Sequence, residues 1–178
     1  MRSRAQSLEL VLLGLLSQSP LHGYELRKRI SAIFGPFRAL SFSVLYPQLR
    51  RMVLAGLIQE SEVEATSRRA RIVYAITPKG AAHFESLTDQ VGADAWDDEG
   101  FEIRFALFSP TPRKSRIRVL EGRLRRLQEK RDLLHIAVEK APADSDKYIH
   151  EWRRHSLESI EREILWLEEM IITEGKSK

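Results

Sequence analysis

The segment from Leu40 to Ile58 constrains the fold most, because a helix start, an amphipathic helix and a helix end follow one another within it. Ser43 can accept a hydrogen bond from a free backbone N–H of a first helical turn, and Pro47 is tolerated only near such a start. Gly56 fits the left-handed position that often closes a helix. We therefore expect a helix over residues 44–55.

The two sides of this helix differ in chemistry. Helical spacing predicts a buried stripe made of Leu45, Leu49 and Met52. The opposite side presents the hydroxyl of Ser43, the phenol of Tyr46 and the guanidinium of Arg50. Such a face suits a helix laid into the major groove of DNA, with phosphates on its flanks. An amphipathic core helix with a solvated polar side is the alternative, and this helix alone leaves both open.

The elements before and after this helix follow from apolar periodicity. It predicts helices over residues 7–17 and 22–34, then strands over residues 57–64 and 71–77. In the first of these strands apolar and polar residues alternate, and in the second the alternating apolar side chains are Ile72, Tyr74 and Ile76. Two such strands separated by a short polar segment predict a β-hairpin.

Thr77 followed by Pro78 is typical of a helix start, so a further helix should run to about Asp89. Three helices, a hairpin and another helix form the order of a winged helix-turn-helix domain, which we place at residues 1–90. The polar tip of the hairpin and its edge carry Arg68, Arg69 and Arg71. Arginines so placed can follow the DNA backbone or enter a minor groove, or they can simply keep a hairpin tip soluble. Arginine on both the helix face and the wing favours DNA binding.

The remaining residues predict a joint and a helical hairpin. Residues 91–112 form the joint, whose aromatic side chains could hold an aromatic or cationic effector or only pack the domains together: Trp96, Phe101, Phe105 and Phe108. Residues 113–178 carry two heptad-spaced stripes joined by a short turn, which predicts coiled-coil dimerisation, with a folded-back monomeric hairpin as the alternative. The dimerising residues would be Ile117, Leu120, Leu124, Leu127, Leu134, Leu157, Ile160, Ile164, Leu167 and Ile171.

Composition and charge limit the class of protein. Among 178 residues, 43% are hydrophobic and 30% are charged, which fits a mainly α-helical soluble protein with a small β-hairpin. Residues 1–84 carry 12 basic against 5 acidic residues, whereas residues 85–112 carry one against 7. A basic domain recruits polyanions through counterion release, and nucleic acid is the default partner. The most apolar run is shorter than the about 20 residues that span a bilayer, so we expect a cytoplasmic protein without a membrane segment.

No catalytic motif is present in the sequence. The chain has no cysteine, which excludes disulfides, thiolate metal sites and cysteine nucleophiles. No zinc-protease motif, phosphate-binding loop or nucleophile elbow occurs, and the five histidines are scattered or, like His150 and His155, do not share a helix face. We therefore expect no catalytic residues, no metal and no cofactor, and a protein that is not an enzyme.

Four sequence motifs together resemble the PadR family of transcriptional regulators. They are HGYEL at residues 22–26, SVLYPQLRRM at 43–52, AGLI at 55–58 and RIVYAITPKG at 71–80. The chain length and the C-terminal pattern resemble the longer subfamily, which has a helical dimerisation domain. The resemblance implies a homodimeric repressor that binds an inverted-repeat operator in double-stranded DNA and is released by a small molecule or a stress signal.

The resemblance also implies DNA-binding roles for individual residues. Tyr46 corresponds to the recognition-helix tyrosine of the family, expected near the DNA backbone, and the arginines of the hairpin correspond to its basic wing. Ser43 stands where the family usually has glycine, so the operator sequence cannot be borrowed from relatives. The predicted DNA-binding residues are Tyr24, Lys28, Ser41, Ser43, Tyr46, Gln48, Arg50, Arg51, Arg68, Arg69 and Arg71. A winged helix that docks on a protein, with the coiled coil as an assembly device, remains the alternative function.

Overall fold

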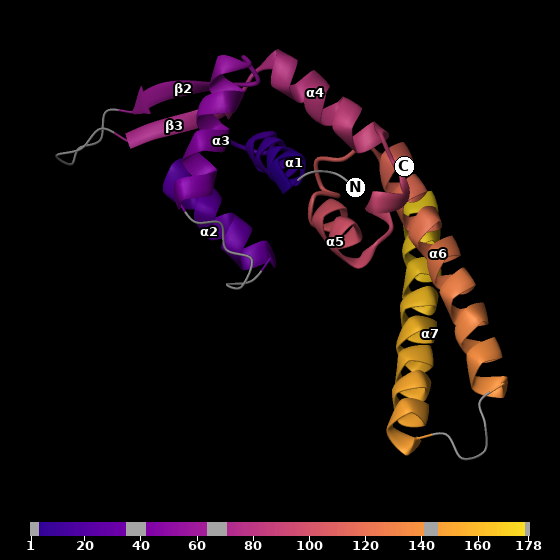
Figure 1. Ribbon diagram of the computed structural model, residues 1–178. Coiled ribbons are helices and arrows are strands. Elements are labelled where there is room, and N and C mark those ends of the chain that lie inside the picture. The colour runs from indigo at the N-terminus through magenta and orange to yellow at the C-terminus, as the bar shows by residue number, and fades with distance from the viewer. Residues whose placement is uncertain (1–3, 35–41, 64–70, 141–145, 177–178) are drawn as a thin grey trace.

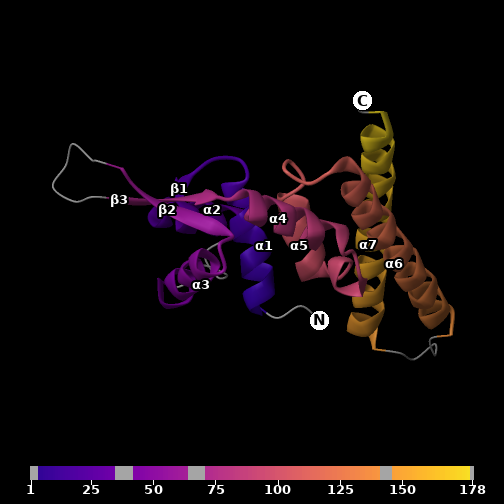
Figure 2. The same cartoon turned by 90° about the horizontal axis from the view of Figure 1, so that it is seen from above.

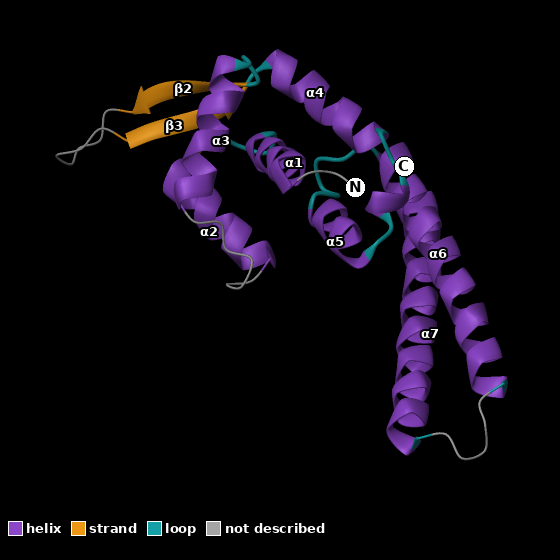
Figure 3. Ribbon diagram, viewed as in Figure 1, coloured by secondary structure: helices purple, strands orange, loops and turns teal. Residues whose placement is uncertain are grey.

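Helices make up most of the chain, and one small antiparallel sheet lies at one end of the molecule (Figures 1 and 3). The computed structural model describes residues 4–34, 42–63, 71–140 and 146–176. Within these residues no helix is both long and apolar enough to cross a membrane. The helices are α1 (Arg4–Leu16), α2 (Gly23–Phe34), α3 (Phe42–Leu54), α4 (Pro78–Asp89), the short 3-10 helix η2 (Ala93–Ala95), α5 (Asp98–Ala106), α6 (Arg113–Glu139) and α7 (Lys147–Lys176).

The sheet has three strands rather than the two predicted from the sequence. β2 (Ile58–Val63) and β3 (Arg71–Ile76) form the expected hairpin, with Ile58 opposite Ile76 and Glu60 opposite Tyr74. The added strand is β1 (Leu21–His22), which pairs with β3 on its other side and gives the order β1-β3-β2. A two-residue strand is too short to show periodicity, so only its pairing with a distant strand defines it.

The inward side of β3 is the one that its alternation predicted, except at the outer end of the strand: Tyr74 lies in the hydrophobic core around α1 and Ile76 packs against that core, whereas Ile72 does not. Ile72 is 45% exposed, whereas Val73 and Tyr74 are buried. Ile72 pairs with Glu62 near the outer end of the described hairpin. Strict alternation predicts burial only where a second layer covers the sheet.

The start of α3 differs slightly from the prediction, and the helix signals that follow it are confirmed. α3 begins at Phe42, so Ser43 lies within the first turn instead of capping it. Gly56 adopts a φ of 69°, the left-handed conformation expected after a helix. Thr77 caps α4, its side chain accepting a hydrogen bond from the backbone N–H of Gly80 at 3.0 Å, and Pro78 is the first helical residue. α4 ends at Asp89, as predicted.

Two hydrophobic cores organise the chain. The first surrounds α1, whose leucines pack against α2, α3, β3 and α4, with Leu12, Leu26 and Leu45 fully buried. The second lies between α5, α6 and α7. Viewed from above, the sheet and the α6–α7 hairpin lie at opposite ends, with α1, α4 and α5 between them (Figure 2). Each fully buried leucine contributes about 2 kcal/mol of transfer free energy.

The predicted joint at residues 91–112 is a folded element rather than a linker. α5 begins at the Asp97 cap, which accepts from the backbone N–H of Gly100 at 2.7 Å. Leu107 just after α5 belongs to the first core, whereas Phe101 and Phe108 belong to the second. The helix was missed because its apolar residues serve two cores and therefore do not form one stripe.

The hairpin of α6 and α7 is present as predicted, but half of the residues assigned to dimerisation are buried within a single chain. They are Leu120, Leu127, Ile160, Ile164 and Leu167. The two stripes face each other across the hairpin, so these side chains cannot meet a second protomer, and that part of the assignment is wrong. Ile117, Leu124, Leu134, Leu157 and Ile171 are half-buried. The exposed apolar side chains of the hairpin lie elsewhere, at Leu133, Ile136, Tyr148, Ile149, Trp152, Leu165, Trp166 and Ile172.

Candidate nucleic-acid interface

α3 divides into the buried and exposed sides that its sequence predicted. Leu45, Leu49 and Met52 are buried in the first core. The exposed side consists of Val44, Tyr46, Pro47, Arg50, Arg51 and Leu54. These six residues, called the α3 face below, are one side of a helix that lies beside the β2–β3 hairpin (Figure 1). Two adjacent guanidinium groups and a phenol on one exposed helix side can contact phosphates and base edges.

Tyr46 owes its position to Gly23, the first residue of α2. A Cβ atom added at Gly23 would lie 2.9 Å from the Tyr46 hydroxyl oxygen and 3.1 Å from Cε1 of its ring. The glycine therefore lets the aromatic ring of α3 lie directly on the start of α2. This contact fixes a side chain that is still 38% exposed.

α2 adds two exposed polar side chains to the same region of the chain. Tyr24 is 69% exposed and Lys28 is exposed, whereas Leu26 is fully buried. The inward place on this part of α2 belongs to Leu26. Tyr24 and Lys28 therefore remain available for a partner.

Among the predicted DNA contacts whose side chains the structure describes, Gln48 is not at the surface. Its residue is 5% exposed, and its amide Nε2 donates to Oε2 of Glu9 on α1 at 3.2 Å. Its amide Oε1 accepts from Nη1 of Arg51 at 3.3 Å. A side chain enclosed between two helices cannot reach a base edge, so its assignment as a direct contact is wrong.

Glu9 and His83 were not singled out by the sequence as parts of the site. Oε1 of Glu9 lies 2.9 Å from Nε2 of His83 on α4, and the side chains are 25% and 38% exposed. A charged residue inside the most apolar helix of the chain was the available signal. Such a residue is tolerated in a core only with partners, and here α3 and α4 supply them.

The wing is described only in part. Arg71 is the first residue of β3. Ser41, Arg68 and Arg69 lie outside the described residues, so their predicted roles stay predictions. Tyr74 of the same strand is buried, and the charges of Tyr46 and Arg50 on the α3 face both act on it.

Tyr74 makes the stability of this domain depend on alkaline pH. Burial, and after it the neighbouring Glu60 carboxylate, together raise the pKa of its phenol from 10.0 to about 12. The unfolded chain loses this proton near pH 10.0, whereas the folded chain keeps it to about 12. The stabilisation is therefore complete below pH 10.0 and is lost between pH 10.0 and about 12.

Between these two pH values we expect the free energy of unfolding to fall by on the order of 1 kcal/mol per pH unit. Urea denaturation across this window checks it, and an equally steep fall in Tyr74→Phe would contradict it.

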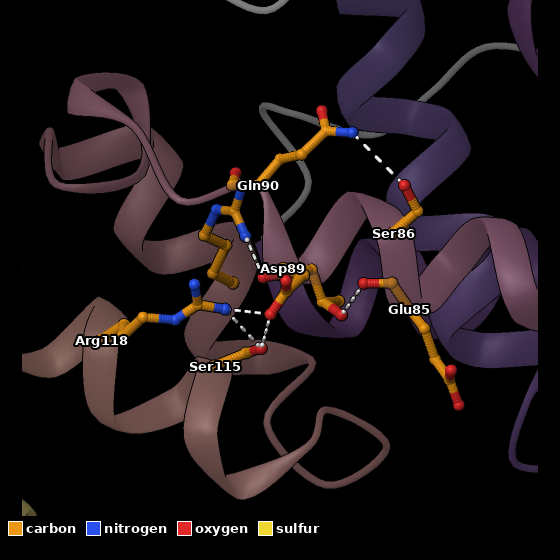
Figure 4. Close-up of polar contacts among 8 residues, drawn as sticks. Glu85, Ser86, Asp89, Gln90, Ser115 and Arg118 are labelled. Carbon is orange, nitrogen blue, oxygen red and sulfur yellow. Dashed lines mark hydrogen bonds and ion pairs between the residues drawn. The ribbon is translucent and has the colours of Figure 1, made fainter.

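The end of α4 is tied to α5 and α6 by a polar cluster (Figure 4). Arg104 is 6% exposed and donates to the carbonyl oxygens of Gln90 at 2.8 Å and Thr88 at 3.4 Å. Asp89 accepts from the hydroxyl of Ser115 at 3.2 Å and pairs with Arg118. The last carbonyl groups of a helix lack partners within the helix, so Arg104 supplies them. The winged domain is thereby joined directly to the helical hairpin.

The four aromatic residues proposed as an effector site do not form one cluster. Phe101, Phe105 and Phe108 pack together with Trp166 of α7, whose ring centroid lies 5.1 Å from that of Phe105. Trp96 instead lies against Gly122 of α6, where an added Cβ would come within 2.0 Å of its indole nitrogen. The clustered rings pack α5 on α7, which is the packing role that the sequence left open.

An open cavity of about 480 Å³ lies where α5, α6 and α7 meet. Of the four predicted effector residues only Phe101 lines it. Its other lining side chains include Arg123, Leu127, Trp152, His155 and Ile160. Aromatic and charged groups of both signs around a cavity of this size can hold a small aromatic molecule.

Comparisons with known proteins agree with the winged domain. Residues 12–86 match the family model described as "Transcriptional regulator PadR-like family". Solved structures similar to this chain include Bacillus subtilis PadR in complex with operator DNA, at 20% identity over 94% of this chain and 98% of that chain, with a TM-score of 0.45. The same protein in complex with p-coumaric acid matches at 21% identity over 96% and 99%, with a TM-score of 0.42. A putative transcriptional regulator from Thermoplasma acidophilum matches at 28% identity over 45% and 75%, with a TM-score of 0.42. No curated protein sequence matched.

Proposed function

Because residues 12–86 of this chain carry a PadR-like transcriptional regulator domain, we propose that the protein is a sequence-specific DNA-binding regulator. Its α3 face lies in the major groove, and the β2–β3 hairpin follows the adjacent backbone. The protein acts as a repressor on double-stranded DNA and is not an enzyme. PadR of Bacillus subtilis has been solved with operator DNA, which makes an operator the natural partner to test for this chain.

One observation carries this proposal: the α3 face presents Tyr46, Arg50 and Arg51 beside the hairpin while the other side of the same helix is buried. Arg50 lies on the side of Tyr74 and the sheet. Arg51 lies on the side of Glu9 and α1, through Gln48. Guanidinium groups on the two flanks of a groove-bound helix are placed to contact the phosphates of both strands.

The proposed assembly is a homodimer formed through the hairpin. Eight large apolar side chains of α6 and α7 are exposed in the single chain, among them Trp152 at 68% and Leu165 at 62%. Exposed apolar side chains on a helical hairpin are commonly covered by a second copy. A two-fold dimer would present two winged domains to an inverted repeat.

The first test measures DNA binding by fluorescence anisotropy, with a duplex that the protein selects from a random-sequence pool. We expect two protomers per duplex, an affinity that falls steeply with salt, and a preference of about a thousandfold over unselected DNA. Arg50→Ala should weaken binding by about tenfold, since it removes a phosphate or base contact. Arg125→Ala is the matched control, because Arg125 is exposed on α6 and far along the chain from the α3 face.

Two results would contradict this assignment. Equal losses in Arg50→Ala and Arg125→Ala would show that only the overall charge matters, and the α3 face would be abandoned. Failure to select any duplex, together with capture of a stoichiometric protein partner by the purified dimer, would support the alternative of a protein-interaction module.

We also propose that a small aromatic effector occupies the cavity between α5, α6 and α7 and releases the DNA. Trp152 is the tryptophan that lines this cavity. In a variant with Trp96→Phe and Trp166→Phe, 1-naphthoate or 1-naphthylmethylammonium should quench the remaining fluorescence at the same concentrations that dissociate the duplex. Dissociation of the duplex without quenching would place the effector elsewhere.

A further inference from the structure

The buried side chain of Gln48 lies between two charged residues, an acidic residue of α1 and an exposed arginine of α3. One end of its amide contacts Glu9 of α1 and the other contacts Arg51 of α3. Glu9 in turn contacts His83 of α4. Three helices of the winged domain therefore meet at a short polar chain that ends on the α3 face.

The direction of the Gln48 amide is set by Glu9. A carboxylate accepts hydrogen bonds and cannot donate one, so it must face the amide nitrogen of Gln48. The amide oxygen then points the other way, toward the guanidinium of Arg51, which can only donate. Reversing the amide would place an oxygen against a carboxylate and an NH2 group against a guanidinium.

His83 of α4 holds the Glu9 carboxylate, which in turn orients the Gln48 amide. Its Nε2 lies 2.9 Å from Oε1 of Glu9, while Oε2 of the same carboxylate accepts from Gln48 at 3.2 Å. With one oxygen held from α4 and the other from α3, the carboxylate has little rotational freedom. The geometry of the chain is thus defined before any partner binds.

We propose that Gln48 is a positioning residue for Arg51: its amide, oriented by Glu9, holds the Arg51 guanidinium on the α1 flank of the α3 face in the conformation that contacts DNA. This inference rests on the proposed function. An exposed arginine loses side-chain freedom when it binds a phosphate or a base, and a preformed hydrogen bond lowers that entropic cost. The charge of Arg50 instead acts on Tyr74 of the sheet.

A double-mutant cycle tests the inference through the selected duplex. Gln48→Met keeps the approximate volume of the side chain and removes both hydrogen bonds. We expect it to weaken DNA binding by about fivefold in the wild-type background, but by less than about twofold when Arg51→Ala is already present. With Arg50→Ala as the matched background, the about fivefold loss should persist, because the Gln48 amide bonds to the guanidinium of Arg51, which that background keeps. Equal losses in all three backgrounds would overturn the proposal.

A second pair of variants guards against simple loss of folding. Gln48→Glu places two carboxylates together and should lower both the thermal midpoint and the DNA affinity. Adding Glu9→Gln restores a donor opposite the new carboxylate, which again faces Arg51. We expect the double variant to recover DNA affinity to within about threefold of wild type. Recovery of the thermal midpoint without recovery of DNA affinity would overturn the positioning role.

A measurement without DNA separates this inference from the proposed function. The Nε–Hε NMR signal of Arg51, assigned by its loss in Arg51→Ala, should show an ordered side chain in the free wild-type protein and a mobile one in Gln48→Met. Equal mobility in both proteins would refute the positioning role even if DNA binding is confirmed. An ordered Arg51 in a protein that selects no duplex would instead refute the proposed function and leave the Gln48–Arg51 contact established.

Discussion

Gly80→Ala is expected to lower the free energy of unfolding of the winged domain by about 3 kcal/mol. A Cβ atom added at Gly80 would lie 2.0 Å from the carbonyl oxygen of Leu57 and 2.9 Å from Cγ1 of Ile76. The closest of these atoms belongs to the backbone, so no side-chain rotation relieves the overlap. The Leu57 carbonyl also accepts from the N–H of Thr77 at 3.1 Å and from its hydroxyl at 3.1 Å. The substitution therefore separates the end of the α3 segment from the start of α4.

Urea denaturation of Gly80→Ala, followed by circular dichroism, measures this loss. Gly175→Ala is the matched control, since nothing lies within 4 Å of the Cβ position and the residue is exposed near the end of α7. That control should be neutral or stabilising by up to about 1 kcal/mol. We also expect weaker DNA binding for Gly80→Ala, because Leu57 connects α3 to β2. An unfolding midpoint equal to that of the control would show that the α3–α4 junction is not the rigid contact described here.

Arg123→Ala is expected to cost about 3 kcal/mol in the second core. The Arg123 side chain is 7% exposed and pairs with Glu163 of α7 and Asp98 of α5, both at 2.8 Å. It donates to the backbone oxygen of Trp96 at 2.9 Å and lies 5.3 Å from the ring centre of Phe101. Its loss leaves the Glu163 carboxylate, 32% exposed, without this cation. The substitution thus loosens α5, α6 and α7 together.

The control for this prediction is Arg131→Ala on the same helix. Arg131 is 34% exposed and pairs at 2.9 Å with its chain neighbour Asp132, which is 63% exposed. An ion pair of that kind contributes at most about 1 kcal/mol, and commonly much less. Thermal or urea unfolding of both variants gives the comparison. A loss in Arg123→Ala no larger than that in Arg131→Ala would mean that the buried arginine does not hold the three helices together.

Local signals in the sequence predicted the helices and the β2–β3 hairpin of the winged domain with ends that lie within about three residues of the observed ones. The Thr77–Pro78 pair started α4, and Gly56 ended the α3 segment with a positive φ. Each depends on the backbone of a few neighbouring residues, so each can be inferred without knowing the fold. β1 and α5 were missed for the opposite reason, since their existence depends on pairing and packing with distant segments.

The candidate site shows the same division. Tyr46 and Arg50 could be placed on an exposed helix side from spacing alone, and they are exposed. Gln48 has the same polar character and lies on the same helix, yet it is buried. Its environment depends on Glu9, 39 positions earlier in the chain, and no pattern within α3 contains that information.

The sequence by itself determined the order of helices and hairpin and the α3 face, because periodicity and capping act within one or two turns of the chain. Only the tertiary structure decided which apolar and polar side chains meet. Half of the residues expected at a dimer interface, such as Leu120 and Ile164, are buried inside the hairpin of a single chain. The Phe105 ring packs against Trp166, whereas Trp96 lies against Gly122. The physical reason is that an apolar stripe requires burial but does not specify the surface that buries it.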